Sequence, residues 1–315
     1  MNIMFLIRNL EYGGAERQLV TLAKGLYAAG YRVMVVAMTG GGPLQTDLRT
    51  GGVPVRDLYR SGKGDIGSII RLIHLIRTYQ PDVIHSYLQT ANLMAVLLKP
   101  LFPHIRIVWG IRASFMDWSK YGRFAQVLYT IECFLSRFAN LIITNSAAAQ
   151  AYAIAQGFPA HKLVVITNGI DTDRFVINRA AGQPLRATWG VSNEQHLIGL
   201  VGSLNPMKDH PTFLHAASLL VKHRHDVRFV CVGNGPPAYR QQLVQLGESL
   251  GVGPYITWAG DHHDMQAVYN AFDSATLTSY GESFPNVIGE AMACGVVCVA
   301  TDVGDIATII ADTGV

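Results

Sequence analysis

Two glutamates, Glu282 and Glu290, stand eight positions apart around the predicted start of a helix. Pro285 comes one residue before Asn286, where the apolar pattern of that helix begins. A helix N-terminus carries free backbone N–H groups and a partial positive charge, so it favours phosphate. A carboxylate beside a sugar can bind its hydroxyls and stabilise positive charge at the anomeric carbon, and another can bind a ribose. The alternative is a charge pair at a helix end without chemical consequence.

A lysine follows another predicted strand, in the run Gly202-Ser203-Leu204-Asn205-Pro206-Met207-Lys208. Gly202 permits close approach of a ligand to the backbone. Lys208 is a compact cation suited to phosphate oxygens. A solvated loop lysine, which is the more common fate of a single lysine, is the alternative.

Two glycine turns also lie between a predicted strand and a predicted helix. Gly13 and Gly14 precede a helix start, where a ligand can touch the backbone and the helix dipole favours an anion. Gly233 and Gly235 fit the dinucleotide pattern G-x-G-x-x-A. That pattern also needs a ribose-binding carboxylate at the end of the next strand, where Asp261 is only loosely suitable, so a nicotinamide oxidoreductase is disfavoured. A plain tight turn is the alternative at Gly13 and Gly14.

Three more polar residues lie at predicted strand ends, without a defined role. His85 belongs to the strand at 82–86 and is expected to face a ligand cleft, and Arg112 follows the strand at 106–109. Asn168, in the Asn-Gly turn after the strand at 163–167, fits both ligand contact and a simple turn into a linker.

The elements that position these residues alternate between β-rich runs and helical stretches, which is typical of parallel α/β architecture. Residues 173–190 lack a periodic apolar face and are predicted to be the linker between two Rossmann-like domains, 1–175 and 176–315. In such sheets a ligand lies outside the carboxyl ends of the strands, where the residues above fall. The predicted strands are 2–7, 32–38, 82–86, 106–109, 141–144, 163–167, 197–201, 228–232, 255–258, 274–277 and 296–300. The predicted helices include 15–29, 65–79, 210–222, 239–250, 264–272, 286–294 and 305–311.

The segment 282–295, with its Phe284-Pro285-Asn286 turn, resembles the donor-site motif of the retaining GT-B glycosyltransferases of family 4, and the agreement continues through 299–304. The resemblance implies two Rossmann-like domains that face each other across a cleft, the first on the acceptor side and the second binding the nucleotide-sugar. It also implies that the second domain is incomplete at its C-terminal end. Glu282 is then expected to contact the transferred sugar and Glu290 the ribose, while backbone amides around the turn hold the diphosphate.

By the same resemblance Lys208 binds the diphosphate and, with Glu282, carries the catalysis. Family members usually have an arginine at Ser203, and Arg8, Arg17 and Arg112 are candidates to replace it. They also commonly place a histidine near Ile111, and this chain has none there. The expected donor-binding residues are Gly14, Gly202, Ser203, Gly233, Gly235, Ser283, Phe284, Pro285, Asn286, Val287 and Glu290.

The function implied is transfer of a sugar, with retained configuration, from a nucleotide diphosphate donor to a hydroxyl acceptor in cell-envelope glycolipid or polysaccharide biosynthesis. A UDP-sugar is the expected donor, and the acceptor is a glycan, a lipid-linked or a small molecule. The resemblance also implies no cofactor and no metal, because members of the family generally work without an essential metal. A nucleotide-sugar epimerase and a non-catalytic nucleotide-sugar-binding protein on the same fold remain alternatives.

The charge of the two halves of the chain indicates which classes of binding partner are possible. Residues 1–175 carry 18 Lys and Arg against 10 Asp and Glu, and residues 176–315 carry 7 against 12, so +8 and −5 give the net charge of +3. The basic half fits anionic lipid or a phosphorylated acceptor, and ordinary surface charge is the alternative. No signal peptide, membrane span or nucleic-acid partner is indicated, and the four cysteines fit buried thiols of a cytoplasmic protein.

One segment bears directly on membrane contact. Residues 118–138 combine Lys120, Arg123 and Arg137 with aromatic residues. They fit an interfacial helix on anionic lipid, which would make the protein peripheral to the inner face of the membrane, or a helix packed on the core. The packed helix is favoured, because the basic residues are sparse.

Overall fold

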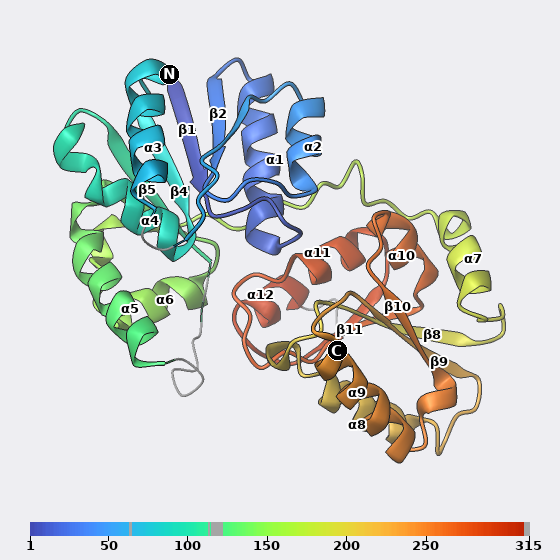
Figure 1. Ribbon diagram of the computed structural model, residues 1–315. Helices are drawn as coiled ribbons and strands as arrows, with labels where there is room; N and C mark the ends of the chain where they lie inside the picture. Colours follow the sequence, from blue (N-terminus) through green and yellow to red (C-terminus); the bar gives the residue numbers. More distant parts are fainter. Residues whose placement is uncertain (63–64, 113, 115–121, 312–315) are drawn as a thin grey trace. The chain divides into compact units, whose positions relative to one another are not determined.

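The computed structural model describes residues 1–62, 65–112, 114 and 122–311 (Figure 1). The chain divides into two compact units, Met1–Asn168 and Gly169–Val315, so the boundary lies earlier than residue 175. Residues 312–315, at the end of the second domain that the resemblance implies to be incomplete, lie outside the described residues, as do Trp118 and Lys120 of the segment 118–138.

The first unit is a parallel sheet of seven strands in the order β3-β2-β1-β4-β5-β6-β7. Its strands are β1 (Asn2–Ile7), β2 (Arg32–Ala37), β3 (Val55–Asp57), β4 (Val83–Tyr87), β5 (Arg106–Ile111), β6 (Leu141–Thr144) and β7 (Leu163–Val165). Its helices are α1 (Gly14–Ala28), α2 (Leu44–Thr50), α3 (Ile66–Tyr79), α4 (Leu88–Leu97), α5 (Arg123–Leu135) and α6 (Ala147–Ala155). The short strand β3 has no counterpart among the predicted strands, and the other six strands are confirmed with small shifts of their ends.

Strand β1 shows why both faces of this sheet are covered. Its alternate residues Phe5 and Ile7 pack with helices α1 and α2. Met4 and Leu6 point to the opposite face and pack with α3 and α4. A parallel strand buried on both faces reads as a continuous apolar run, which is what residues 3–7 are.

The second unit repeats this arrangement with five parallel strands in the order β10-β9-β8-β11-β12. Its strands are β8 (His196–Val201), β9 (Val227–Val232), β10 (Ile256–Gly260), β11 (Ser274–Leu277) and β12 (Val297–Ala300). Its helices are α7 (Arg179–Thr188), α8 (His210–Leu220), α9 (Pro237–Ser249), α10 (Met265–Ala271), α11 (Asn286–Ala293) and α12 (Ile306–Ile310). Two Rossmann-like sheets are therefore confirmed.

The predicted linker is wrong in one respect, because residues 179–188 of it form helix α7 inside the second unit. A Cβ at Gly182 would lie 2.3 Å from the backbone nitrogen of Ala271, so the glycine allows α7 to pack closely on α10. The guanidinium of Arg186 is buried and forms an ion pair with Asp273 at 2.8 Å. Gly182 and Pro184 are poor helix formers, so the sequence does not show that this segment is helical. Gly182 is nevertheless the residue that allows α7 to pack closely on α10.

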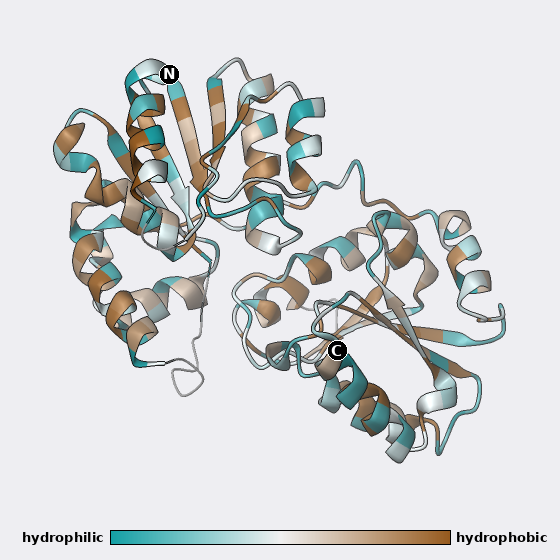
Figure 2. Cartoon of the chain, viewed as in Figure 1, coloured by the Kyte–Doolittle hydropathy of each residue, from teal (hydrophilic) through white to brown (hydrophobic). Residues whose placement is uncertain are grey.

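Helix α5 packs one face on the core of the first unit and exposes another. The hydropathy colouring shows apolar residues along this helix (Figure 2), and Tyr129, Cys133 and Leu135 among them pack against the core. Glu132 is the one buried residue of the helix. The favoured packed helix is therefore confirmed for one face of α5, while Phe124 and Val127 on another face stay exposed. In the described part of the chain no helix is long and apolar enough to cross a bilayer.

The carboxylate of Glu132 is held by two amide donors. Gln89 Nε2 donates to it at 3.0 Å and Asn92 Nδ2 at 3.3 Å, and Ser86 Oγ donates to Asn92 Oδ1 at 2.8 Å. No lysine or arginine of the described residues pairs with Glu132. Burial outweighs these hydrogen bonds and raises the pKa of Glu132 from 4.5 to about 7. The fold therefore favours the neutral carboxyl group.

This shift predicts a pH-dependent stability. A raised folded-state pKa contributes stability that is complete below the unfolded pKa and is lost as the pH rises through the folded pKa. Glu132→Gln is neutral at every pH, so we expect its free energy of unfolding to change little between pH 4.5 and pH 8. Over the same pH range the wild type should lose on the order of 3 kcal/mol of unfolding free energy relative to Glu132→Gln. Urea unfolding at a series of pH values measures the difference, with the exposed Glu248→Gln as control. A difference that does not change with pH would contradict the shift.

Candidate functional site

The strand order defines one point in each sheet where a ligand site is expected. In both sheets the order reverses after the first strand, between β1 and β4 in the first unit and between β8 and β11 in the second. Open parallel sheets bind ligands at this switch point, outside the carboxyl ends of the two strands. In the second unit, Lys208 lies in the loop after β8 and Glu282 in the loop after β11.

Lys208 and Glu282 form an ion pair. Lys208 Nζ lies 2.5 Å from Glu282 Oε1, and the two side chains are 21% and 13% exposed. Ser279 Oγ donates to the same carboxylate oxygen at 2.7 Å. The structure thus brings together the two residues that the sequence predicts to be catalytic, and it adds Ser279, which the sequence analysis missed.

The loop after β8 holds Lys208 in a short 3-10 turn, η5 (Pro206–Lys208). Asn205 accepts a hydrogen bond from the Met207 amide, and Asp209 caps α8 from a left-handed conformation at φ 47°. A Cβ at Gly202 would lie 3.5 Å from the Lys208 stem, so the stem lies along this glycine. Gly202 is therefore placed beside Lys208, while the hydroxyl of the neighbouring Ser203 accepts a hydrogen bond from Asn205 Nδ2 at 2.7 Å.

The loop after β11 is fastened to the Lys208 turn through the backbone. Thr278 Oγ1 donates to the carbonyl oxygens of Lys208 at 3.0 Å and Asp209 at 2.9 Å. The Tyr280 amide donates to the Met207 carbonyl at 3.1 Å. These bonds set the spacing of the two loops and therefore the distance across the ion pair.

Gly304 supports the Glu282 loop from below. Its φ of +62° lies in the left-handed region, and a Cβ there would meet the carbonyl oxygen of Glu282 at 2.1 Å. The adjacent Asp305 amide donates to the Ser283 carbonyl at 3.2 Å, and Thr301 Oγ1 donates to the Ser279 carbonyl at 2.6 Å. The sequence contains these residues in the run that carries the family resemblance, but it assigns them no role.

Gly233 and Gly235 have a packing reason to be glycine. A Cβ at Gly233, whose φ is +132°, would meet the carbonyl oxygen of Gly202 at 2.2 Å, and one at Gly235 would meet that of Leu204 at 2.2 Å. The two glycines let the loop after β9 lie directly against the loop that carries Lys208. Contact of either glycine with a ligand stays a prediction.

Glu290 contacts a different residue from Glu282. It is buried on α11, and Tyr269 Oη of α10 donates to its Oε2 at 2.7 Å. Helix α11 starts after Pro285, and no side chain caps it there. The segment Ser283, Phe284, Asn286 and Val287 therefore surrounds a helix N-terminus with a partial positive charge.

His210 is a further residue that the sequence did not single out. It follows Asp209 at the start of α8, is fully buried, and neither ring nitrogen has a hydrogen-bond partner. Burial, with a smaller effect of the nearby Lys208 charge, lowers the pKa of His210 to about 4. The ring is therefore neutral beside Lys208 at physiological pH and adds no second positive charge.

In the first unit, Gly14 begins α1 and Gly13 precedes it. A Cβ at Gly13 would lie 2.1 Å from Glu16 Oε2, so the Glu16 carboxylate folds back over the start of this helix. Burial raises the pKa of Glu16, although a hydrogen bond from its own amide opposes the rise. A side-chain carboxylate thus already lies at the helix start where the sequence predicts an anion to bind.

His85, Arg112 and Asn168, which had no defined role, lie in one cluster around Tyr87. The Arg112 guanidinium stacks on the Tyr87 ring at 4.8 Å, donates to Tyr87 Oη at 3.1 Å and donates to Asn168 Oδ1 at 2.7 Å. The His85 ring lies 4.7 Å from that of Tyr87. No carboxylate in the described ranges pairs with Arg112, and its Nε is buried without a partner.

His85, which the sequence predicts to face a ligand cleft, has a buried side chain. Its ring is 7% exposed and packs against Phe5, and its Nε2 has no hydrogen-bond partner. Burial, and secondarily the Arg112 charge, lowers the pKa of His85 to about 3. The side chain is therefore a neutral member of the core beneath Tyr87.

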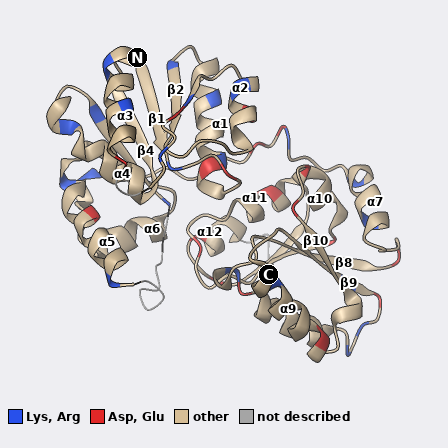
Figure 3. Ribbon diagram, in the orientation of Figure 1, with Lys and Arg blue, Asp and Glu red and all other residues tan. Residues whose placement is uncertain are grey.

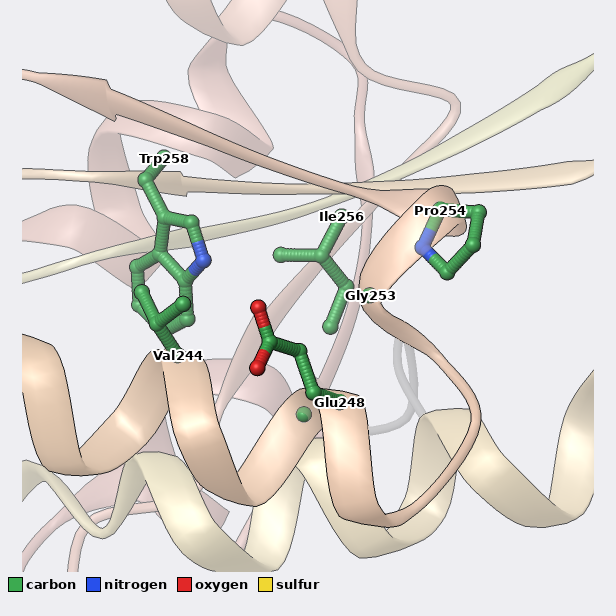
Figure 4. A pocket seen from close by; sticks show the side chains of 7 residues that line it. Val244, Glu248, Gly253, Pro254, Ile256 and Trp258 are labelled. Carbon is green, nitrogen blue, oxygen red and sulfur yellow. The ribbon is translucent and has the colours of Figure 1, made fainter.

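A surface pocket in the second unit lies away from these residues (Figure 4). It is lined by side chains of α9 and β10, including Val244, Glu248 and Trp258, and by none of the predicted site residues. No group of three His, Cys, Asp or Glu residues within the described ranges could hold a metal ion.

Two Rossmann-like sheets of the same strand order define the class of two-domain α/β proteins to which the GT-B glycosyltransferases belong. Residues 12–174 match the family described as Glycosyltransferase Family 4, and residues 195–315 match Glycosyl transferases group 1. This chain belongs to glycosyltransferase family 4.

Curated relatives include the D-inositol 3-phosphate glycosyltransferases of Mycolicibacterium smegmatis and Mycobacterium sp. strain KMS. The first is 30% identical over 179 residues and the second 32% over 180 residues. The matches cover 55% of this chain and 40% and 39% of the relatives, so the chain spans about two fifths of their length.

Two solved structures are similar over the whole chain. Anabaena HepE in complex with UDP and glucose is 26% identical with a TM-score of 0.86, and 84% of it is covered. The sucrose-phosphate synthase of Thermosynechococcus elongatus is 18% identical with a TM-score of 0.84, and 85% of it is covered. The second likeness concerns the fold alone.

The contact between Gly304 and the Glu282 carbonyl predicts an unequal effect of two glycine substitutions. Gly304→Ala adds a methyl group where no space exists, while Gly251→Ala, at φ +73°, has open space around the new methyl. We expect Gly251→Ala to lower the free energy of unfolding by about 1 kcal/mol, because alanine is strained at a positive φ. Gly304→Ala should lower the free energy of unfolding several times more, because the new methyl group displaces the Glu282 loop. Urea unfolding of both variants tests this, and equal losses would refute it.

Proposed function

We propose that this protein transfers a sugar from a nucleotide diphosphate donor, expected to be a UDP-sugar, to a hydroxyl group of an acceptor, with retained anomeric configuration. The observation that carries the proposal is the Lys208–Glu282 ion pair at the switch point of the second sheet. Family membership supports it, and so does the similarity to HepE, which was crystallised with UDP and glucose and with UDP-glucose.

Charge explains how this site would hold the donor. A diphosphate carries negative charge, and Lys208 Nζ and the N-terminus of α11 are positive groups that compensate it. Glu282 cannot turn freely, because Ser279 and Lys208 both hold its Oε1. We assign Lys208 to the diphosphate and Glu282 to hydroxyl groups of the sugar.

The same groups would act during transfer. When the sugar–phosphate bond breaks, negative charge grows on the nucleotide phosphate and positive charge on the sugar. Groups already in place for those charges lower the barrier, because they need no reorganisation. Lys208 faces the first charge and Glu282 the second. We propose neither a cofactor nor a metal for this step.

The nucleotide part has a defined candidate of its own. We assign Glu290 to the ribose hydroxyls, as the family resemblance implies. The hydrogen bond from Tyr269 to its Oε2 leaves the orientation of this carboxylate fixed before a ligand arrives. The remaining donor-binding residues keep the roles that the resemblance gives them.

The acceptor is assigned to the first unit, where Arg112 is half-buried with no carboxylate partner in the described ranges. A cation in that position is compensated by an anion, so we propose an acceptor that carries a phosphate or carboxylate group. The curated relatives are named D-inositol 3-phosphate glycosyltransferases, which supports the phosphate. A role in envelope glycolipid or polysaccharide synthesis, at the inner face of the membrane, belongs to the same proposal.

The donor assignment predicts that Lys208→Ala weakens nucleotide-sugar binding at least tenfold, because a charge-assisted contact is lost. The exposed Lys222→Ala, on the same unit, should bind as the wild type does. Calorimetry with UDP-, GDP- and ADP-sugars measures the affinities. An unchanged affinity of Lys208→Ala would defeat the assignment, and no binding of any nucleotide-sugar would defeat the proposed function.

Assays of the same protein samples distinguish a transferase from the two alternative functions. A nucleotide-sugar epimerase forms an epimer from the donor without any acceptor, and a binding protein forms no product with or without one. For a transferase, Glu282→Gln should lower kcat much more than donor affinity, since the carboxylate acts on charge that develops during transfer.

The acceptor assignment predicts that Arg112→Gln weakens binding of D-inositol 3-phosphate at least tenfold when UDP occupies the donor site. The exposed Arg106→Gln, at the start of the strand β5 that Arg112 follows, removes a charge of the same kind outside the Tyr87 cluster and should have no such effect. Titration calorimetry compares the variants. Equal affinity of the wild type and Arg112→Gln would remove Arg112 from the acceptor site without touching the donor assignment.

A further inference from the structure

Helix α5 and the turn after it expose a row of apolar side chains, which we call the apolar stripe. Its members recur at alternating intervals of three and four residues, so they share one face of the helix. They are Phe124 (64% exposed), Val127 (57%), Ile131 (44%), Phe134 (54%) and Phe138 (50%).

The stripe is not the apolar face of an ordinary surface helix. Such a helix turns its apolar face toward the core and its polar face toward water. On α5 the inward face includes Leu128, Tyr129 and the buried Glu132, while the outward face is also apolar. A contiguous exposed apolar surface on a folded unit marks an interaction site.

Basic groups surround the stripe. Arg123 stands at the start of α5, and Arg137 lies beyond its end with its guanidinium stacked 4.0 Å over the Phe134 ring. Figure 3 shows Lys and Arg at both ends of this helix. Lys162 donates to the carbonyl oxygens of Arg137 and Ala139, so its ammonium group lies at the same end as Arg137.

Negative charge is scarce around the same segment. Residues 99–162 carry 7 Lys and Arg and 2 Asp and Glu. Of those two acids, Glu132 is buried and Asp117 lies outside the described residues. The surface that the structure describes in this segment therefore exposes basic and apolar groups and no carboxylate.

We propose that the apolar stripe and its basic neighbours dock the protein on an anionic lipid bilayer. Phenylalanine and aliphatic side chains enter the boundary of head groups and acyl chains, while the flanking arginines and lysines contact lipid phosphates. Apolar insertion and charge attraction together give the two contributions that stable peripheral binding needs. This inference goes beyond sugar transfer and involves no residue of the Lys208–Glu282 site.

A second copy of the chain fits the surface less well. A two-fold contact would place the stripe against itself and bring arginines of the two copies together. Like charges across an interface are unfavourable, and no exposed described carboxylate of residues 99–162 would compensate them. An anionic bilayer supplies the missing negative charge.

Vesicle sedimentation tests the proposal with the whole chain. Vesicles of phosphatidylglycerol and phosphatidylcholine in equal parts should bind the wild type, and vesicles of phosphatidylcholine alone should bind it far less. Val127→Gln with Ile131→Gln, which replaces two exposed side chains, should weaken binding at least tenfold. Leu219→Gln, at 61% exposure on α8 of the other unit, should bind as the wild type does.

Charge and self-association are tested in parallel. Arg123→Gln with Arg137→Gln should weaken binding about fivefold for each charge removed, and added salt should weaken wild-type binding further. If the wild type does not bind anionic vesicles, or the stripe variant binds as well as it does, the proposal is wrong. A wild-type dimer that the stripe variant converts to a monomer would assign the surface to a second copy instead.

UDP affinity, measured on the same variants, separates this proposal from the proposed function. The stripe variant should bind UDP as the wild type does, which also shows that it is folded. Loss of vesicle binding with intact UDP binding supports the docking surface. Absence of UDP binding in the wild type would count against sugar transfer and leave the vesicle result to be judged by itself.

Discussion

The contact between Lys208 and Glu282 is the interaction around which the second unit is arranged. Two mostly buried, opposite charges meet at 2.5 Å where the strand order reverses. Such a pair persists only if its surroundings fix the geometry, because taking charges out of water is costly and a small displacement loses the attraction. Thr278, Ser279 and Gly304 provide that constraint through the hydrogen bonds and the close backbone contact that fix the two loops.

The glycines give the same constraint in another form. Gly233 and Gly235 bring the loop after β9 against Gly202 and Leu204, and Gly304 brings the loop after β12 against Glu282. Four loops from separate strands therefore lie in backbone contact around one ion pair. A site of this kind depends on positions where a side chain has no room as much as on the charged groups themselves.

Much of the fold could be predicted from the sequence, because parallel strands buried on both faces are continuous apolar runs. Helix α7 could not, since Gly182 and Pro184 disguise it and its fit to α10 is a long-range effect. The residues at strand ends could be listed, but their partners could not, because which loops meet depends on strand order. Tyr87 joining Arg112 to Asn168, and Tyr269 holding Glu290, are contacts of that kind. The exposure of the stripe on α5 could not be predicted either. The spacing of apolar residues shows that they share one face of a helix, but not whether that face points to the core or to solvent.

The ion pair has a consequence for how the two units attract ligands. A lysine and a carboxylate in contact cancel each other beyond short range, and the neutral ring of His210 adds nothing, so this pair projects little field into solvent. Arg112, which no carboxylate of the described residues pairs with, and the basic surface around α5 reach further. Under the proposed function, capture of an anion from a distance therefore belongs to the first unit. In the same proposal, discrimination by close fit, nearly independent of ionic strength, belongs to the second.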